Sequence, residues 1–144
     1  MENPKYENSK IYKITDLNDE MMYIGSTIQP LEKRLSMHKS HYRRYLKTQR
    51  NKLSSFEIFE RYGLENCKIE LIEEYPCESR RELSDREGEH IKENDCVNKN
   101  VAGRTSLEWY HDNKERLKEK RIKLEIEKII NDIVKKIVEH IKNN

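Results

Sequence analysis

The sequence predicts an α+β domain with a three-stranded sheet, followed by a long C-terminal helix. Two short runs rich in isoleucine and tyrosine flank a turn-forming segment, which is typical of a β-hairpin. Two helical patterns, a third strand pattern and another helical pattern follow along the chain. After Gly103 the chain contains neither glycine nor proline, so a single helix can run from there to the end.

The first element is a β-hairpin over residues 10–14 and 21–25. Both segments favour strands, and residues 16–20 between them are turn formers. If the turn is centred between residues 17 and 18, Tyr12 and Tyr23 face each other across the hairpin. The hairpin is therefore expected to bring two phenol side chains together.

Two helices, a strand and a third helix complete the predicted core. Pro30 opens a helix in which apolar residues recur at near-helical spacing: Leu31, Leu35, Tyr42 and Leu46. Ser54 and Ser55 cap a second, short helix, which Gly63 ends. Residues 67–72 alternate as a strand, a polar helix follows over about residues 78–93, and residues 96–98 are extended.

The long helix begins at a capping box formed by Thr105 and Glu108. Its far part carries a broad apolar face, made of Ile126, Ile129, Ile130, Ile133, Val134, Ile137, Val138 and Ile141. Such a face is covered either by docking on the core or by self-association, and the polar outer face favours a homo-oligomer through residues 122–141. We therefore expect a core domain over residues 1–104 and a helical extension over residues 105–144.

The composition indicates a modest core with a highly charged surface. Of the 144 residues, 39% are charged and 34% are hydrophobic, with a mean hydropathy of -1.10. No run approaches the ~18 apolar residues of a membrane span, and the N-terminal residues lack the apolar stretch of a signal peptide. The three cysteines fit neither a disulfide framework nor a zinc motif, so we expect reduced thiols and an intracellular protein.

Positive charge is concentrated in the first predicted helix. Between residues 31 and 52 the chain has eight basic residues and one acidic residue. Lysine and arginine release condensed counterions when they bind phosphates, so this cluster is typical of a polyphosphate-binding surface. A solvated basic helix explains the same pattern equally well. The basic and aromatic residues of segment 109–123 allow the same two interpretations, a DNA contact or a solvated helix.

A carboxylate stands in the middle of an otherwise apolar helix face, formed by Leu83, Glu87 and Ile91. A buried carboxylate must be paired, bound to a metal or neutralised, because burying it bare costs several kcal/mol. A salt bridge is the structural explanation and a metal site the functional one. Glu89 is the rival for a ligand role, but a step of two residues turns it by about 200° around the helix, toward the polar side.

The basic helix also carries a stripe of functional side chains, made of Arg34, His38, His41 and Tyr45. Arginine binds a phosphate in a bidentate manner, and histidine exchanges a proton near neutral pH. The stripe therefore suits a nucleic-acid partner. A zinc site built from the two histidines and a cysteine is disfavoured, because the chain has no paired ligand motif.

Two tripeptides and four single residues occur in a recognisable order. They are Lys10-Ile11-Tyr12, Tyr23-Ile24-Gly25, Arg34, His38, Glu87 and Asn98. In this set the chain resembles the GIY-YIG nuclease family over about residues 9–104, with Lys10 in place of the first glycine. The resemblance implies an α/β sandwich around a three-stranded antiparallel sheet. The chain is also similar to homing endonucleases and to family copies in large DNA viruses, which implies the cytoplasm or nucleus of a host cell.

The resemblance also implies a role for each matching residue. Tyr12 would be the general base or its partner, and Tyr23 would line the same site. Arg34 would hold the scissile phosphate, and His38 would aid proton transfer. Glu87 would be the only protein ligand of one Mg²⁺ or Mn²⁺ ion, and Asn98 would shape the site. The side chains expected to bind DNA are Lys33, His41, Arg43, Arg44 and Lys47.

These roles make one physical demand on Tyr12. A free tyrosine has a pKa near ~10, so it acts as a base only if neighbouring positive charge lowers that pKa. The metal, Arg34, Lys13 or Lys33 would supply the charge. A single embedded carboxylate suits one metal ion that keeps several waters, as Mg²⁺ and Mn²⁺ do.

The leading hypothesis is a metal-dependent endonuclease that cuts DNA. The alternative from another class is a catalytically inactive nucleic-acid-binding scaffold that oligomerises through its C-terminal helix. An enzyme that acts on RNA or on branched DNA differs from the leading hypothesis only in substrate.

Overall fold

The computed structural model of the protein describes residues 4–144, so the first three residues of the N-terminal segment lie outside it. The chain divides into two units, Met1–Arg104 and Thr105–Asn144. Among residues 4–104, the described part of the first unit, there are two 3-10 turns, three strands and three helices. In chain order the elements are η1 (Pro4–Tyr6), β1 (Lys10–Asp16), β2 (Met22–Thr27), α1 (Leu31–Thr48), α2 (Phe56–Tyr62), η2 (Leu64–Asn66), β3 (Cys67–Glu74) and α3 (Arg80–Glu93). The predicted order of strands and helices is confirmed.

The three strands form one antiparallel sheet in the order β2-β1-β3. The predicted pairing inside the hairpin is wrong by two residues, because Tyr12 lies opposite Gly25 and Tyr23 lies opposite Ile14. The reason is the turn, which the carboxylate of Asp16 organises. Its oxygens accept hydrogen bonds from the backbone N–H groups of residues 18, 20 and 21, each over 2.9 Å, and so move the centre of the turn toward residue 19.

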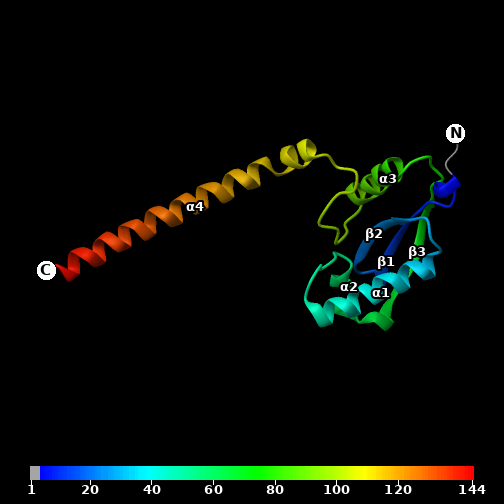
Figure 1. Cartoon of the computed structure of the whole chain (residues 1–144), viewed down its shortest axis with the longest axis horizontal. Coiled ribbons are helices and arrows are strands. Elements are labelled where there is room, and N and C mark those ends of the chain that lie inside the picture. Colours follow the sequence, from blue (N-terminus) through cyan, green and yellow to red (C-terminus); the bar gives the residue numbers. More distant parts are fainter. Residues whose placement is uncertain (1–3) are drawn as a thin grey trace. The chain divides into compact units, whose positions relative to one another are not determined.

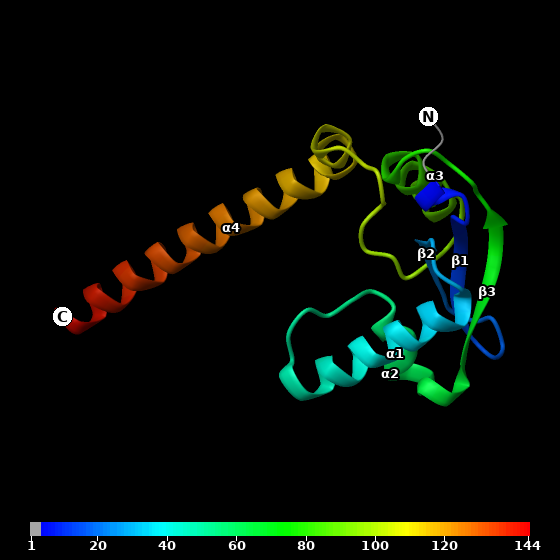
Figure 2. The ribbon, with the colours of Figure 1, turned by 45° about the vertical axis from the view of Figure 1, so that its right-hand side comes forward.

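Helices cover both faces of the sheet, as the two apolar cores show. Tyr12 and Ile14 of β1 point into a core shared with α1 and α2, and Ile11 points into a second core shared with α3. In Figures 1 and 2, α1 and α2 lie together on one side of the strands and α3 lies on the other. The α+β sandwich predicted from the sequence is therefore confirmed.

Ion pairs hold α3 to the sheet. Glu73 of β3 accepts hydrogen bonds from Arg86 over 2.7 and 3.2 Å and pairs with His90 Nε2 at 2.9 Å. Glu89 pairs with Arg86 as well, and its side chain is exposed. This cluster orients α3, so that Leu83 and Ile91 are buried between the helix and the sheet.

The helix ends follow the predictions with one exception. Pro30 precedes α1, and Gly63 ends α2 with a φ of 84°, a value that suits glycine. The exception is the start of α2, where Ser55 occupies the capping position but makes no side-chain capping bond. Its hydroxyl instead lies 3.0 Å from His38 Nδ1, and the Ser54 hydroxyl accepts a hydrogen bond from the backbone N–H of Lys99. Both serines predicted to cap α2 therefore make hydrogen bonds to residues outside this helix.

The second unit is the helix α4 (Ser106–Lys142), which has 37 residues. The predicted capping box is present, with reciprocal hydrogen bonds between Thr105 and Glu108. None of its residues is buried, and Ile126 to Ile141 of the apolar face are 42% to 68% exposed. Within residues 4–144, no helix combines the length and apolarity needed to cross a membrane. The three cysteines of the first unit are free thiols.

Candidate active site

The site begins with Tyr12, a completely buried tyrosine in the central strand β1. Arg34 of α1 donates a hydrogen bond from Nε to the Tyr12 hydroxyl oxygen over 3.0 Å. The same hydroxyl lies 2.7 Å from Nε2 of His38, one helical turn further along α1. Arginine has no acceptor, so the proton of the Tyr12 hydroxyl remains available for His38.

His38 is neutral at physiological pH. Burial is the main cause, helped by the positive charge of Arg34 and by His41, and together they lower its pKa from 6.5 to about 3. A neutral imidazole has one donor and one acceptor nitrogen. If Nε2 accepts from Tyr12, Nδ1–H donates to the Ser55 hydroxyl 3.0 Å away. Arg34, Tyr12, His38 and Ser55 then form a continuous series of hydrogen bonds, in which each residue donates to the next.

The expectation that positive charge lowers the pKa of Tyr12 is wrong for the protein alone. Burial raises that pKa, and this outweighs the opposing effects of Arg34 and of the Tyr23 hydroxyl. The two proposed lysines do not act on Tyr12. Lys13 lies 3.3 Å from Glu70, and Lys33 is exposed. Tyr12 is therefore a protonated phenol whose proton has an acceptor in place.

Gly25 makes room for the Tyr12 hydroxyl. It lies directly opposite Tyr12 in the hairpin. A Cβ atom at this position would stand 2.5 Å from the hydroxyl oxygen and 2.6 Å from Cζ of the ring, closer than unbonded atoms approach. Glycine therefore stands at this position of the second tripeptide because a larger residue would clash with Tyr12. This role depends on a contact across the hairpin and has no local signal in the sequence.

Tyr23 lies beside the same cluster, although Tyr12 and Tyr23 are not opposite each other in the hairpin register. Its ring centroid is 6.5 Å from that of Tyr12 and 5.4 Å from that of His38. Burial is the main reason why the pKa of Tyr23 is raised. The structure thus brings Tyr12, Tyr23, Arg34 and His38 together on one face of the sheet.

Glu87 approaches from the other face, on α3. Its carboxylate accepts a hydrogen bond from the Ser26 hydroxyl of β2 over 2.5 Å. Burial raises its pKa, while the Ser26 hydrogen bond and the charge of Arg34 act in the opposite direction. Glu87 is therefore hydrogen-bonded to the neutral Ser26 hydroxyl, in place of the salt bridge considered from the sequence. Glu89 points elsewhere, toward Arg86.

The two halves of the site meet at a cavity of about 520 Å³. The polar residues that line it are Lys5, Ser26, Thr27, Gln29, Arg34, Arg80, Ser84 and Glu87. β2 is an edge strand, so side chains from the two faces of the sheet reach a common space around it. Arg34 therefore touches the hydroxyl of Tyr12 on one side and shares a cavity with Glu87 on the other.

Asn98 supports this edge strand. Its side chain pairs with the backbone of Ile24, accepting from N–H over 2.9 Å and donating to C=O over 2.7 Å. The backbone N–H of Val97 donates to the carbonyl of Met22 over 2.8 Å. Asn98 is absent from the described residues that line the cavity. It holds β2 in place and thereby shapes the site indirectly.

The side chains expected to bind DNA are all exposed on α1. His41 and Arg44 line a second cavity of about 510 Å³, which Arg34 also lines. Lys33, Arg43 and Lys47 are not among the described residues that line it. Two of the five exposed side chains therefore lie at a cavity, and the other three do not.

Two residues of the site were missed from the sequence. Ser26 shares the strand face of Ile24, and this alternation was the signal that could have placed it near Glu87. Ser55 gave no such signal, because a serine before a helix looks like an ordinary cap.

The fold is thus an α+β sandwich in which tyrosine, histidine, arginine and glutamate side chains lie near one edge of a three-stranded antiparallel sheet. The family model of the GIY-YIG catalytic domain matches residues 8–100, well over half of the chain. The chain belongs to this family of nuclease domains. The comparison with curated proteins gives no match, and neither does the comparison with solved structures. The similarity to viral copies and homing endonucleases stays a prediction.

Proposed function

We propose that the protein is a metal-dependent endonuclease that hydrolyses DNA phosphodiester bonds at the cavity between Arg34 and Glu87. The observation that carries this proposal is the hydroxyl of Tyr12, held between a donating guanidinium and an imidazole that can accept its proton. A purely structural tyrosine needs one hydrogen-bond partner and no proton acceptor of this kind.

In hydrolysis a water molecule loses a proton as its oxygen bonds to phosphorus, and the bond from phosphorus to one sugar oxygen breaks. The sugar oxygen leaves and takes a proton from solvent. Tyr12 takes the proton of the attacking water on its hydroxyl oxygen while its own proton moves to His38 Nε2, 2.7 Å away. A free tyrosinate is then never required, which agrees with the raised pKa of Tyr12. Ser55 accepts from Nδ1 of His38 and stabilises the imidazolium that forms.

Arg34 holds the phosphate. Its Nε is occupied by Tyr12, and its two Nη groups remain for the phosphoryl oxygens. A phosphate held by these Nη groups would lie next to the hydroxyl of Tyr12. Charge that develops on the phosphoryl oxygens is then met by a fixed cation.

The residues on the α3 side fit a divalent metal ion. Glu87 offers hard oxygen ligands, its hydrogen-bond partner Ser26 is neutral, and the cavity has room for several water molecules. No group of three or more histidine, cysteine, aspartate or glutamate side chains that could hold an ion occurs among residues 4–144. Glu87 would thus hold Mg²⁺ or Mn²⁺ together with water and phosphate oxygens. When bound, the ion neutralises charge on the phosphate.

The same proposal includes self-association through residues 122–141 of α4. Apolar residues recur there at 122, 126, 130, 133, 137 and 141, so the pattern repeats after eleven residues. A repeat of this length keeps an apolar seam on one side of a helix over many turns. A second copy would cover the seam and supply a second site for the other DNA strand.

The solution mass of the full chain and of a chain ending at residue 121 tests this association. We expect the full chain to have at least twice its monomer mass and the shortened chain to be a monomer. A full chain that is a monomer at all concentrations contradicts the association and leaves the nuclease proposal intact.

The nuclease is tested by conversion of supercoiled plasmid to open-circle and linear forms with Mg²⁺, Mn²⁺ or EDTA. We expect cutting that depends on the metal, a loss of about 10³-fold in Glu87→Gln, and near-normal cutting in Glu89→Gln. The second variant removes a carboxylate from the same helix that points away from the cavity. A well-folded protein that binds DNA but never cuts it would instead support the inactive scaffold.

A further inference from the structure

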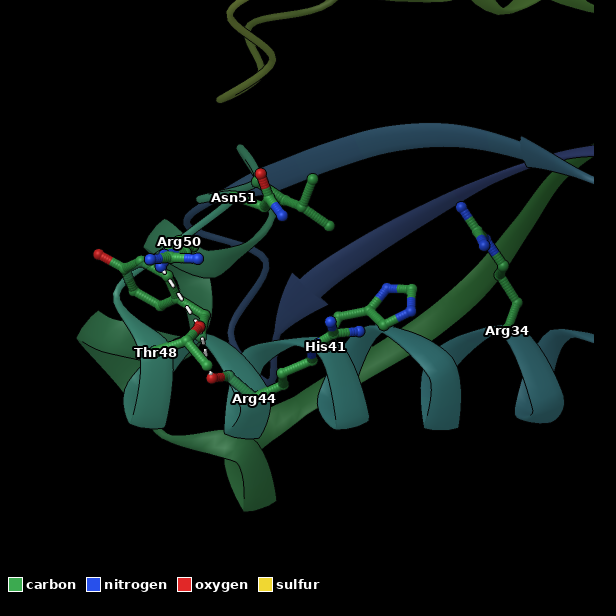
Figure 3. Close-up of a pocket in the computed structure, with 8 residues that line it drawn as sticks. Arg34, His41, Arg44, Thr48, Arg50 and Asn51 are labelled. Atoms are coloured by element: carbon green, nitrogen blue, oxygen red, sulfur yellow. Dashed lines mark hydrogen bonds between the residues drawn. The ribbon is translucent and has the colours of Figure 1, made fainter.

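The second cavity lies along α1, from Arg34 to the end of the helix, and against the segment that follows it. Its volume is about 510 Å³. Figure 3 shows Arg34 at one end and Arg50 at the other, with His41 and Arg44 between them. Arg34 also lines the catalytic cavity, so the two cavities adjoin through one guanidinium group.

The wall of this cavity combines cations with an apolar surface. It has three arginines and a histidine, and no carboxylate is among the described residues that line it. Tyr45 and Leu53 supply the apolar part, and the Leu53 side chain is 39% exposed. A phosphate alone needs only the cations. The apolar wall indicates a ligand with a hydrophobic, flat portion next to its negative charge.

Local hydrogen bonds fold segment 49–53 back along the end of α1. Gln49 and Asn51 both have left-handed backbone conformations, with φ of 54° and 60°. The N–H of Gln49 donates to the carbonyl of Tyr45 over 2.7 Å, and Lys52 lies 2.9 Å from Glu60 of α2. The segment is therefore anchored at both ends, and the cavity is formed before any ligand binds.

We propose that this cavity binds one unpaired nucleotide of the substrate strand, next to the phosphate that is cut. Arg44 and Arg50 bind its phosphate, and the base packs against Leu53 and Tyr45. This inference rests on the proposed nuclease function and adds the substrate class, namely DNA with an unpaired or displaced nucleotide beside the cut.

Duplex DNA does not use such a cavity well. Its bases are stacked inside the helix, and its backbone is read by exposed cations on an open surface. A base must leave the stack before it can enter a pocket, which costs least where it is already unpaired. Packing of a base against apolar and aromatic side chains then favours the unpaired substrate by about tenfold or more.

The test is equilibrium binding in EDTA of labelled duplex DNA and of the same duplex with two unpaired nucleotides. We expect the parent protein to bind the unpaired form about tenfold more tightly, and Leu53→Ser to reduce this ratio to about threefold or less. Arg44→Gln should weaken binding of the unpaired form more than binding of the duplex. Arg43→Gln is the matched control, because Arg43 neighbours Arg44 in the sequence, is exposed and does not line the cavity. This substitution should weaken binding of both DNA forms equally.

The outcomes separate this inference from the nuclease proposal. Metal-dependent cutting with equal affinity for the two DNA forms overturns the inference and leaves the nuclease in place. A ratio that Leu53→Ser leaves unchanged also overturns it. A free deoxynucleoside monophosphate is added as a competitor, and if it binds as tightly as the unpaired DNA, the cavity is a site for free nucleotides and the inference fails. Absence of any DNA binding contradicts the nuclease proposal itself.

Discussion

The two sides of the catalytic cavity are built differently. On the α1 side, Tyr12 and His38 are buried. The Tyr12 hydroxyl and both ring nitrogens of His38 have hydrogen-bond partners in the protein. On the α3 side, Glu87 has one neutral partner, Ser26, and faces the cavity. A satisfied network moves a proton along a fixed path, whereas an incompletely satisfied carboxylate can bind an outside cation. In the proposed mechanism, proton transfer therefore belongs to the α1 side and charge neutralisation to the α3 side.

Arg34 connects the two sides, so its removal should have the largest effect. Arg34→Ala removes both the hydrogen bond to Tyr12 and the phosphate-binding guanidinium, and we expect plasmid cutting to fall by about 10³-fold. Arg34→Lys keeps the charge but has no Nε to hold Tyr12, so most of the loss should remain. Full activity of the lysine variant would show that the charge matters and the contact with Tyr12 does not.

Gly25 tests how tightly the α1 side is packed. Gly25→Ala places a Cβ atom 2.5 Å from the Tyr12 hydroxyl, so the ring or the strand must shift. Overpacking of this kind costs about 1–3 kcal/mol of unfolding free energy, and the displaced hydroxyl should also lower cutting. Chemical denaturation and the plasmid assay measure the two effects. An alanine variant with the stability and activity of the parent contradicts the described packing.

His38 makes stability depend on pH in a defined direction. Its pKa is about 3 in the folded protein, below the ordinary 6.5, so the unfolded chain takes up a proton first as the pH falls. Its contribution to stability is complete above the ordinary pKa and declines toward the folded one. Between about pH 7.5 and pH 5 we expect a loss of about 2 kcal/mol that His38→Asn does not show. The free energy of unfolding in urea is measured at each pH for both proteins. If it changes with pH in the same way in both, His38 is not a buried neutral imidazole.

Ser26 should give the smallest effect, and on the α3 side only. Its hydrogen bond opposes the rise that burial causes in the pKa of Glu87. Ser26→Ala should therefore raise that pKa further, and the acidic limb of kcat/KM should move to higher pH. Unfolding stability should change by about 1 kcal/mol or less. A limb that stays in place would mean that Glu87 does not control it.

Sequence reasoning succeeded where periodicity or a local motif carried the information. The order of strands and helices along the chain, the start of α1 after Pro30 and the capping box at Thr105 all follow from short patterns. Glu87 was noticed because a carboxylate interrupts an apolar stripe. Each of these signals is contained within a few turns of chain.

It failed where contacts between distant residues decide the outcome. The pairing of Tyr12 with Gly25 depends on the Asp16 carboxylate in the turn, and Ser55 is a partner of His38 because α2 packs against α1. The pKa of Tyr12 depends on how completely it is buried, which no local pattern states. These properties belong to the folded protein rather than to any segment of the sequence.

The central claim is that Tyr12 passes a proton to His38 during DNA cleavage, and Tyr12→Phe tests it most directly. The substitution removes one oxygen atom from a buried ring and keeps the packing. The measurement is the rate of plasmid cutting with Mg²⁺, alongside DNA affinity in EDTA and the thermal midpoint. We expect cutting to fall by at least about 10²-fold, while affinity stays within about twofold. Cutting by Tyr12→Phe at the parent's rate would contradict the claim.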